Sequence, residues 1–257
     1  MICFAAIVAH PVLSIPAIGA DAKLSATVSS LKQIKQEFYA AKPDSLIIVS
    51  PHVPGPNGAL TLNQNKSLTV TFRDFGDLTP YGTINNNIGL AYRLRQQVET
   101  KIPLVAIETT ELDHGSSVPL FHLLDALKQV SIVSVGTANE IDLATHFSCG
   151  QEWRKPLELT NERLALLVSA DLTHDSKDRP TADSQAFDRK LINWIEQRDT
   201  KALMALPQDN PLVQSVCGLR PIMLLFGLLQ EKAFTVSSLS YERTLGIGYY
   251  NALMRVR

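Results

Sequence analysis

Three apolar runs constrain the fold of this chain more than any other feature of its sequence. They cover residues 2–9, 46–49 and 164–168, and none of them contains a charged side chain. Their apolar residues are continuous, without the spacing of three to four positions that marks an amphipathic helix. We interpret each run as a strand buried on both faces, as in a parallel sheet that helices cover on both sides.

Segments with a helical period alternate with these runs. In the first of them, Leu24, Val28, Leu31, Ile34 and Phe38 share one helix face. Further helices are predicted at residues 88–98, 118–127, 139–149, 187–195 and 218–231, and further strands at residues 68–72, 103–107, 130–135, 234–239 and 246–253. This alternation predicts an α/β fold with a central, mostly parallel or mixed β-sheet and helices on both faces. Because no segment resembles a linker, we expect one domain over residues 1–257.

The composition argues against several classes of partner. The chain is 45% apolar and 19% charged, with a formal net charge of −1. A balance this close to neutral gives no basic surface for nucleic acid or for an anionic membrane. No apolar stretch is long enough to span a bilayer. We therefore expect neither nucleic acid nor membrane as a partner, while the sequence leaves a homo-oligomer open.

The cysteines and the first residues bear on location. Cys3, Cys149 and Cys217 are odd in number and far apart, which favours a reducing compartment over a disulfide framework. Residues 1–20 are apolar and end in small side chains, as signal peptides do. They lack a basic start, however, and a histidine and two prolines interrupt them. We expect a cytoplasmic protein.

A histidine stands at the end of four predicted strands or within a few residues of it. These are His10, His52, His114 and His174. Open α/β sheets bind ligands at the carboxyl ends of their strands, so we expect the four imidazoles to line one pocket. Imidazole is the commonest metal ligand in proteins, which makes a metal site plausible there. For any one of the four alone, the alternative is a loop histidine bonded to backbone carbonyls.

Two aspartates and a cysteine accompany these histidines. Asp113 precedes His114, where its carboxylate can orient the imidazole or cap the helix that follows. Asp171 can orient a histidine or bind a substrate hydroxyl, and His174 can move protons near neutral pH. Cys217 stands at the start of an apolar helix, whose positive end would lower the pKa of the thiol and make it a soft metal ligand. The alternative is a small buried side chain.

Other catalytic motifs are missing from the sequence. There is no G-x-S-x-G, no P-loop and no G-x-G-x-x-G, so the hypotheses of a serine hydrolase or a nucleotide-binding protein have no motif behind them. His122 and His146 fall within predicted helices, and we expect them to be core or surface residues rather than ligands.

The order of the site motifs resembles a known family. The motifs are His10-Pro11, Ser50-Pro51-His52, Leu112-Asp-His-Gly115, Ser169-x-Asp-Leu-x-His174, Cys217-Gly-Leu-Arg220 and Ser240-Tyr-Glu242. This order resembles the catalytic subunit of the class III extradiol ring-cleavage dioxygenase superfamily, the LigB type. Within it, the chain is most similar to the LigB-like branch allied to Memo proteins and the AmmeMemoRadiSam system.

The resemblance implies a mixed sheet with an Fe(II) site at its strand ends. His10 and His52 match the two metal-binding histidines, and His114 and His174 match those that line the substrate pocket. Extradiol enzymes complete the iron site with a carboxylate, whereas the matching position here is Cys217, as in Memo-like proteins. A thiolate favours Cu or Zn over iron. Glu242 is the other residue considered as the source of a carboxylate.

Two main functions follow from this resemblance. The first is a non-haem Fe(II) dioxygenase that opens a catechol- or aminophenol-type aromatic ring with O2. In it, His114 and His174 accept and donate protons, while Asp113 and Asp171 orient these two histidines. The second is a non-catalytic Memo-like metal-binding or redox protein that acts with a radical-SAM system. A third, weaker alternative is metal-assisted hydrolysis.

Overall fold

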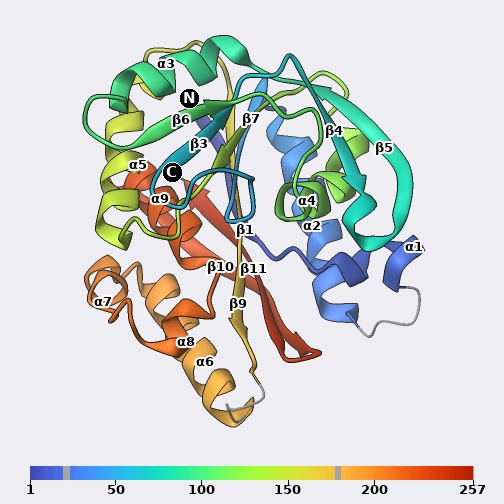
Figure 1. The fold of residues 1–257 in the computed structure, drawn as a ribbon, viewed down its shortest axis with the longest axis vertical. Helices are drawn as coiled ribbons and strands as arrows, with labels where there is room; N and C mark the ends of the chain where they lie inside the picture. Colours follow the sequence, from blue (N-terminus) through green and yellow to red (C-terminus); the bar gives the residue numbers. More distant parts are fainter. Residues whose placement is uncertain (20–23, 177–180, 257) are drawn as a thin grey trace.

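A mixed sheet of nine strands runs through the molecule, and helices cover both of its faces (Figure 1). The computed structural model describes residues 1–19, 24–176 and 181–256. The strand order is β10-β11-β1-β8-β2-β7-β3-β6, and β9 pairs with β11. A separate hairpin joins β4 to β5. The predicted α/β fold is confirmed.

The strands have the following bounds: β1 (Ile2–Val8), β2 (Ser45–Ser50), β3 (Leu60–Asn63), β4 (Ser67–Phe72), β5 (Asp77–Asn85), β6 (Leu104–Ile107), β7 (Ser131–Gly136), β8 (Leu164–Ser169), β9 (Asp171–His174), β10 (Phe234–Thr244) and β11 (Ile247–Val256). The helices are α1 (Pro16–Gly19), α2 (Ser25–Ala41), α3 (Ile88–Val98), α4 (His114–Leu123), α5 (Leu143–Glu158), α6 (Thr181–Gln197), α7 (Thr200–Met204), α8 (Pro211–Gln214) and α9 (Leu219–Leu229).

The centre of the sheet consists of four adjacent parallel strands, β1, β8, β2 and β7. Val8 of β1 lies level with Ser169 of β8, and Val49 of β2 lies level with Val168. The three strands therefore end at one height. The chain that leaves β1 and the chain that leaves β2 emerge on either side of the end of β8.

The apolar runs divide their side chains between two cores. In β1, Ala5 and Ile7 face one core, while Phe4, Ala6 and Val8 face the other. Because side chains alternate along a strand, burial on both faces requires a continuous apolar run. This is why the runs identified the central strands without showing an alternating pattern.

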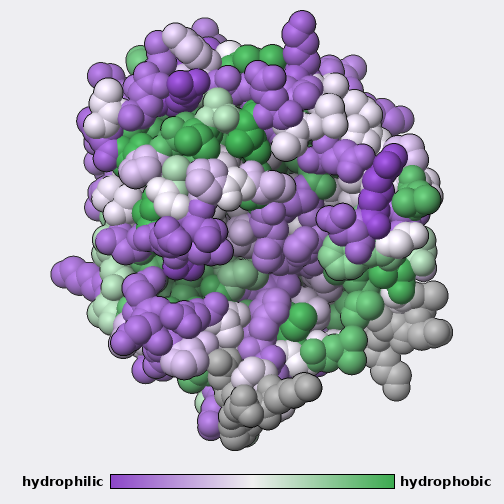
Figure 2. Space-filling model, viewed as in Figure 1, coloured by the Kyte–Doolittle hydropathy of each residue, from purple (hydrophilic) through white to green (hydrophobic). Residues whose placement is uncertain are grey.

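Each core is closed by its own set of helices. α3, α5 and α9 pack on one face of the sheet, and α2, α4 and the β4–β5 hairpin pack on the other (Figure 1). None of the helices in the described ranges is long and apolar enough to cross a membrane. Hydrophilic residues cover much of the face seen in Figure 2, including its middle.

The local structure differs from the predictions at three places. The helix expected from residue 118 begins at His114, because Asp113 caps it by accepting a hydrogen bond from the Ser116 N–H at 3.0 Å. The strand β3 was not predicted. It has only four residues and is fixed by pairing with β7 and β6 rather than by a local pattern. The strand predicted at residues 68–72 is present, but in the separate hairpin rather than in the main sheet.

The crossing of α5 and α9 gives a test of this packing. A Cβ atom added to Gly227 would lie 2.0 Å from the backbone oxygen of Phe147 in α5. We expect Gly227→Ala to lower the free energy of unfolding by about 1–3 kcal/mol, because the helices must separate to accept the methyl group. Urea titration of both proteins would measure this change.

Gly89→Ala in α3 is the matched control, since the nearest atom to its added Cβ lies 3.7 Å away. Alanine favours a helix over glycine by up to about 1 kcal/mol, so this variant should be as stable as the wild type or more so. Equal stabilities for the two variants would contradict the close crossing.

Candidate metal centre

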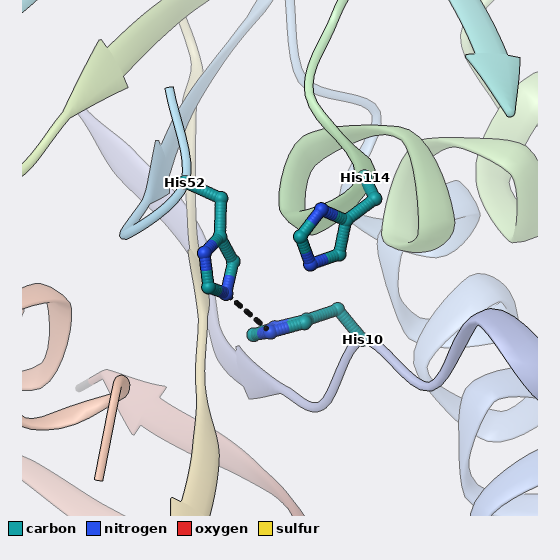
Figure 3. Close-up of side chains that lie close together, drawn as sticks. All are labelled: His10, His52 and His114. Atoms are coloured by element: carbon teal, nitrogen blue, oxygen red, sulfur yellow. Dashed lines mark hydrogen bonds between the residues drawn. The ribbon is translucent and has the colours of Figure 1, made fainter. Parts of the chain in front are cut away.

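Three imidazoles from three separate segments converge at the carboxyl edge of the sheet (Figure 3). His10 lies two residues after β1, His52 two residues after β2, and His114 in the first turn of α4. One nitrogen from each of the three lies within 4.8 Å of the others. The rings of His52 and His114 stack with their centroids 4.3 Å apart, and His10 meets the His52 ring edge-on. The predicted convergence of these three residues is present in the structure.

Helix α4 is tied directly to the end of β2. The Ser50 hydroxyl donates a hydrogen bond of 2.6 Å to the Asp113 carboxylate, which also caps α4 through Ser116. Gly115 permits this close approach, because a Cβ at that position would lie 2.4 Å from Ser50 Oγ. His52 and His114 are therefore held against each other by the residues beside them.

A short chain of hydrogen bonds fixes the tautomer of His10. Pro119 lacks an N–H, so the carbonyl of Gly115, four residues earlier, has no helical donor from that position. The Ser169 hydroxyl donates to that carbonyl at 2.5 Å and lies 2.8 Å from His10 Nδ1. A hydroxyl has a single proton, so Ser169 must accept from Nδ1–H. His10 Nε2 then carries the lone pair that a metal requires.

The Nε2 atom of His10 faces three further groups. His52 Nε2 lies 3.1 Å from it, Asp171 Oδ2 3.3 Å, and Cys217 Sγ 3.7 Å. Asp171 also accepts a hydrogen bond from the His10 backbone N–H at 2.9 Å. Nitrogen, carboxylate oxygen and sulfur thus each lie within 3.7 Å of His10 Nε2, while the group whose ligand atoms all lie within 4.8 Å of one another is His10, His52 and His114.

Burial sets the protonation of these groups. It lowers the pKa of His10 far below the usual range and that of His52 to about 4, with the neighbouring histidines adding to both effects. Burial also raises the pKa of Asp171 to about 7. The imidazoles are therefore neutral at neutral pH, and the contact between His10 and Asp171 is not an ion pair.

The thiol of Cys217 differs from the prediction. Burial, followed by the nearby Asp171 carboxylate, raises its pKa well above the usual value. The expected lowering by the end of α9 is wrong because loss of solvent outweighs the helix dipole. The thiol is protonated unless a cation displaces its proton.

The contacts of the two aspartates and His174 can be compared with the roles predicted for these residues. Asp113 bonds Ser50 and Ser116 and caps α4, which is the second of the two roles considered for it, and it positions His114 in this way. Asp171 contacts His10 rather than a pocket histidine. His174 ends β9, and its charge would lower the pKa of both His10 and His52, which places it beside the cluster.

Three other residues lie outside the cluster. Glu242 accepts hydrogen bonds from the backbone and side chain of Thr27 in the first turn of α2, so this carboxylate serves α2 and not the metal site. His122 bonds Ser14, and His146 is buried against the backbone around residues 138–142. Neither histidine belongs to the group formed by His10, His52 and His114.

Two open pockets flank His52. One, of about 590 Å³, reaches His114 and the turn before β5, and the other, of about 570 Å³, reaches Cys217 and the start of α5. Both give the cluster access to small molecules. Two residues beside the cluster were not recognised from the sequence: Ser169, which bonds His10, and Phe75, whose ring centroid lies 5.3 Å from that of His114. The proline at position 119, which frees a carbonyl four residues earlier, was the available signal for Ser169.

The donor set fits a borderline metal ion. Two nitrogens bound tetrahedrally at 2.0–2.1 Å lie about 3.3 Å apart, and a nitrogen and a thiolate sulfur about 3.6 Å apart. The observed 3.1 and 3.7 Å are close to these values. Neutral imidazoles with a carboxylate and a thiol suit Fe(II), Zn or Cu.

Comparisons with known proteins show which family the chain is similar to. The family model for the catalytic LigB subunit of aromatic ring-opening dioxygenase matches residues 4–251. Protein CA_C1420 of Clostridium acetobutylicum is 28% identical, a match that covers 93% of this chain and 54% of that protein. The chain thus spans about half the length of this curated relative.

The fold also recurs in a solved structure. The crystal structure of the uncharacterized protein JW3007 from Escherichia coli K12 superposes with a TM-score of 0.70 at 16% identity, covering 98% of this chain and 99% of that one. This likeness supports the fold alone. The family match spans nearly all of the sequence, including each strand end that carries a histidine. This chain therefore belongs to the LigB family, that of the catalytic subunit of aromatic ring-opening dioxygenases.

Proposed function

We propose that this protein is a metal-dependent extradiol-type dioxygenase that opens a catechol- or aminophenol-type ring with O2. The observation that carries the proposal is that a second neutral imidazole nitrogen, His52 Nε2, and a carboxylate oxygen of Asp171 lie 3.1 and 3.3 Å from the neutral His10 Nε2. Two histidines and one carboxylate form the ligand set of many non-haem Fe(II) oxygenases. Asp171 supplies the carboxylate that could not be assigned from the sequence.

Each residue of the site has its own role in the proposed reaction. His10 and His52 would hold the metal through Nε2, with Asp171 as the third ligand. When bound, Fe(II) would supply the redox and Lewis-acid chemistry that joins the ring to O2. His114 and His174, whose burial lowers their pKa values, are neutral bases able to accept a proton from a substrate hydroxyl. Ser169 keeps His10 in the required tautomer.

A second candidate is supported by Cys217. Its sulfur lies 3.7 Å from His10 Nε2, which suits a His-His-Cys site for Cu or Zn. Such a site would bind or sense a redox metal without opening rings, as a Memo-like protein acting with a radical-SAM system would.

Oxygen uptake tests the first candidate. Protein loaded anaerobically with Fe(II) should consume O2 with at least one member of a panel of catechols and aminophenols, and His52→Ala should lose uptake at least about 100-fold because a metal ligand is removed. An oxygen electrode measures the rate. His146→Ala, a buried histidine outside the cluster, controls for the loss of an imidazole. No uptake by protein that holds its iron would reject the dioxygenase and favour the second candidate.

Ligand variants separate the two candidates. If Asp171 is the third ligand, Asp171→Asn should weaken Fe(II) binding about 10- to 100-fold, and Cys217→Ser should change it less than about threefold. Competition with a chelator measures the affinities. The reverse ranking, with binding lost in Cys217→Ser and retained in Asp171→Asn, would assign the third position to the thiolate.

The pKa of Asp171 predicts a pH dependence. Burial raises that pKa to about 7, so below pH 7 a cation must displace the carboxyl proton. We expect the affinity for Zn(II) to rise by up to about tenfold per pH unit towards pH 7 and then to level off. Asp171→Asn should flatten this slope between pH 5.5 and 7. An unchanged profile in that variant would mean that Asp171 does not titrate with metal binding.

A further inference from the structure

The two pockets beside His52 differ in chemistry. The pocket that reaches His114 is lined by Phe72 and Phe75, whereas the lining described for the pocket that reaches Cys217 has no phenylalanine, tyrosine or tryptophan. Phe75 is 42% exposed, and its ring centroid lies 5.3 Å from that of His114. An exposed aromatic ring beside the cluster gives a planar substrate a surface on which to pack. We call this pocket, bounded by residues 71–75 and 108–114, the hairpin pocket.

The hairpin pocket is strongly acidic. Its lining contains four carboxylates, Asp74, Glu108, Glu111 and Asp113, and one cation, Arg73, which gives a formal charge of −3 with neutral histidines. A bound divalent metal would still leave −1. The field in the pocket therefore favours a positive group and opposes a carboxylate-bearing one.

Two of these carboxylates are accounted for by the protein itself. Glu111 pairs with Arg73 at 3.3 Å, and Asp113 accepts hydrogen bonds from the residues around it. Asp74 and Glu108 are exposed at the rim. Asp74 also acts on the cluster, since its charge opposes the lowering of the His114 pKa by burial.

Thr71, whose hydroxyl is buried, belongs to the lining of the same pocket. Thr71 is 6% exposed, and its Oγ1 has no hydrogen-bond partner among the described residues. A buried polar group without a partner is costly unless a ligand or water satisfies it. Thr71 lines this pocket and not its neighbour, which favours this pocket as the one that receives a polar ligand.

We propose that the hairpin pocket selects aromatic substrates that carry a side-chain ammonium group. The ring packs near Phe75 with its reacting hydroxyls toward His52 and His114, and the ammonium group lies between Asp74 and Glu108. Two experiments test this inference. The catalytic experiment rests on the proposed ring-opening function, whereas the binding experiment is independent of that function.

The binding experiment uses Zn(II)-loaded protein and two probes without ring hydroxyls, 2-phenylethylamine and 3-phenylpropanoate. Calorimetry should show the amine binding about tenfold more tightly, as two partly exposed charge pairs of up to about 1 kcal/mol each allow. The preference should fall to about twofold in Asp74→Asn/Glu108→Gln. In Asp74→Lys/Glu108→Lys it should reverse in favour of the carboxylate. Glu140→Gln, an exposed acid lining the other pocket, should keep the wild-type preference.

The catalytic experiment compares oxygen uptake for catechols that carry a 2-aminoethyl, a propyl or a 2-carboxyethyl chain. We expect kcat/KM to be highest for the amine, intermediate for the neutral catechol and lowest for the acid. The differences between the three values should become smaller in Asp74→Asn/Glu108→Gln. Amine preference in both experiments supports the subsite. Equal or acid-preferring binding, or an amine preference unchanged in both double variants, overturns the subsite even if rings are opened. Amine-selective binding without uptake from any catechol keeps the subsite and rejects ring opening.

Discussion

The whole site depends on two imidazole nitrogens held 3.1 Å apart at the edge of a parallel sheet. Once His10 Nε2 is restricted to its lone pair, the two nitrogens can share only a proton from His52 or a cation. The Asp171 carboxyl group, 3.3 Å from His10 Nε2, would further stabilise a positive charge placed there when it is ionised. Because the group is buried, protonating the imidazoles is unfavourable, which favours the proposed metal ion as the source of positive charge.

The fold produces this arrangement through the register of its central strands. β8 lies between β1 and β2, and its last residue, Ser169, reaches the imidazole delivered by β1. The same serine bonds the carbonyl that Pro119 leaves free in α4. A proline in α4 thus helps to set the tautomer of His10, one of the proposed ligands. The hydroxyl of Ser169 therefore links the hydrogen bonding of the α4 backbone to the orientation of His10 in the proposed metal site.

Local sequence patterns specify only part of this site. A buried strand must be continuously apolar, so β1, β2 and β8 were visible, and the histidines that follow them were expected to meet. The proposed third ligand was not visible, because Asp171 approaches His10 only through the crossing from β8 to β9. Glu242 carries the same functional group, but the pairing of β10 with β11 directs it to α2. The ionisation of Cys217 was also mispredicted, since its burial is a property of the assembled fold.

The position of the metal itself is the most direct test. A crystal soaked anaerobically with Fe(II) and measured at the iron absorption edge would locate the ion by its anomalous signal. We predict one strong peak within about 2.3 Å of the Nε2 atoms of His10 and His52, with an oxygen of Asp171 as the next protein ligand. A peak bound by Cys217 in place of Asp171 would support the Memo-like alternative. The absence of iron between the two histidines would contradict the central claim.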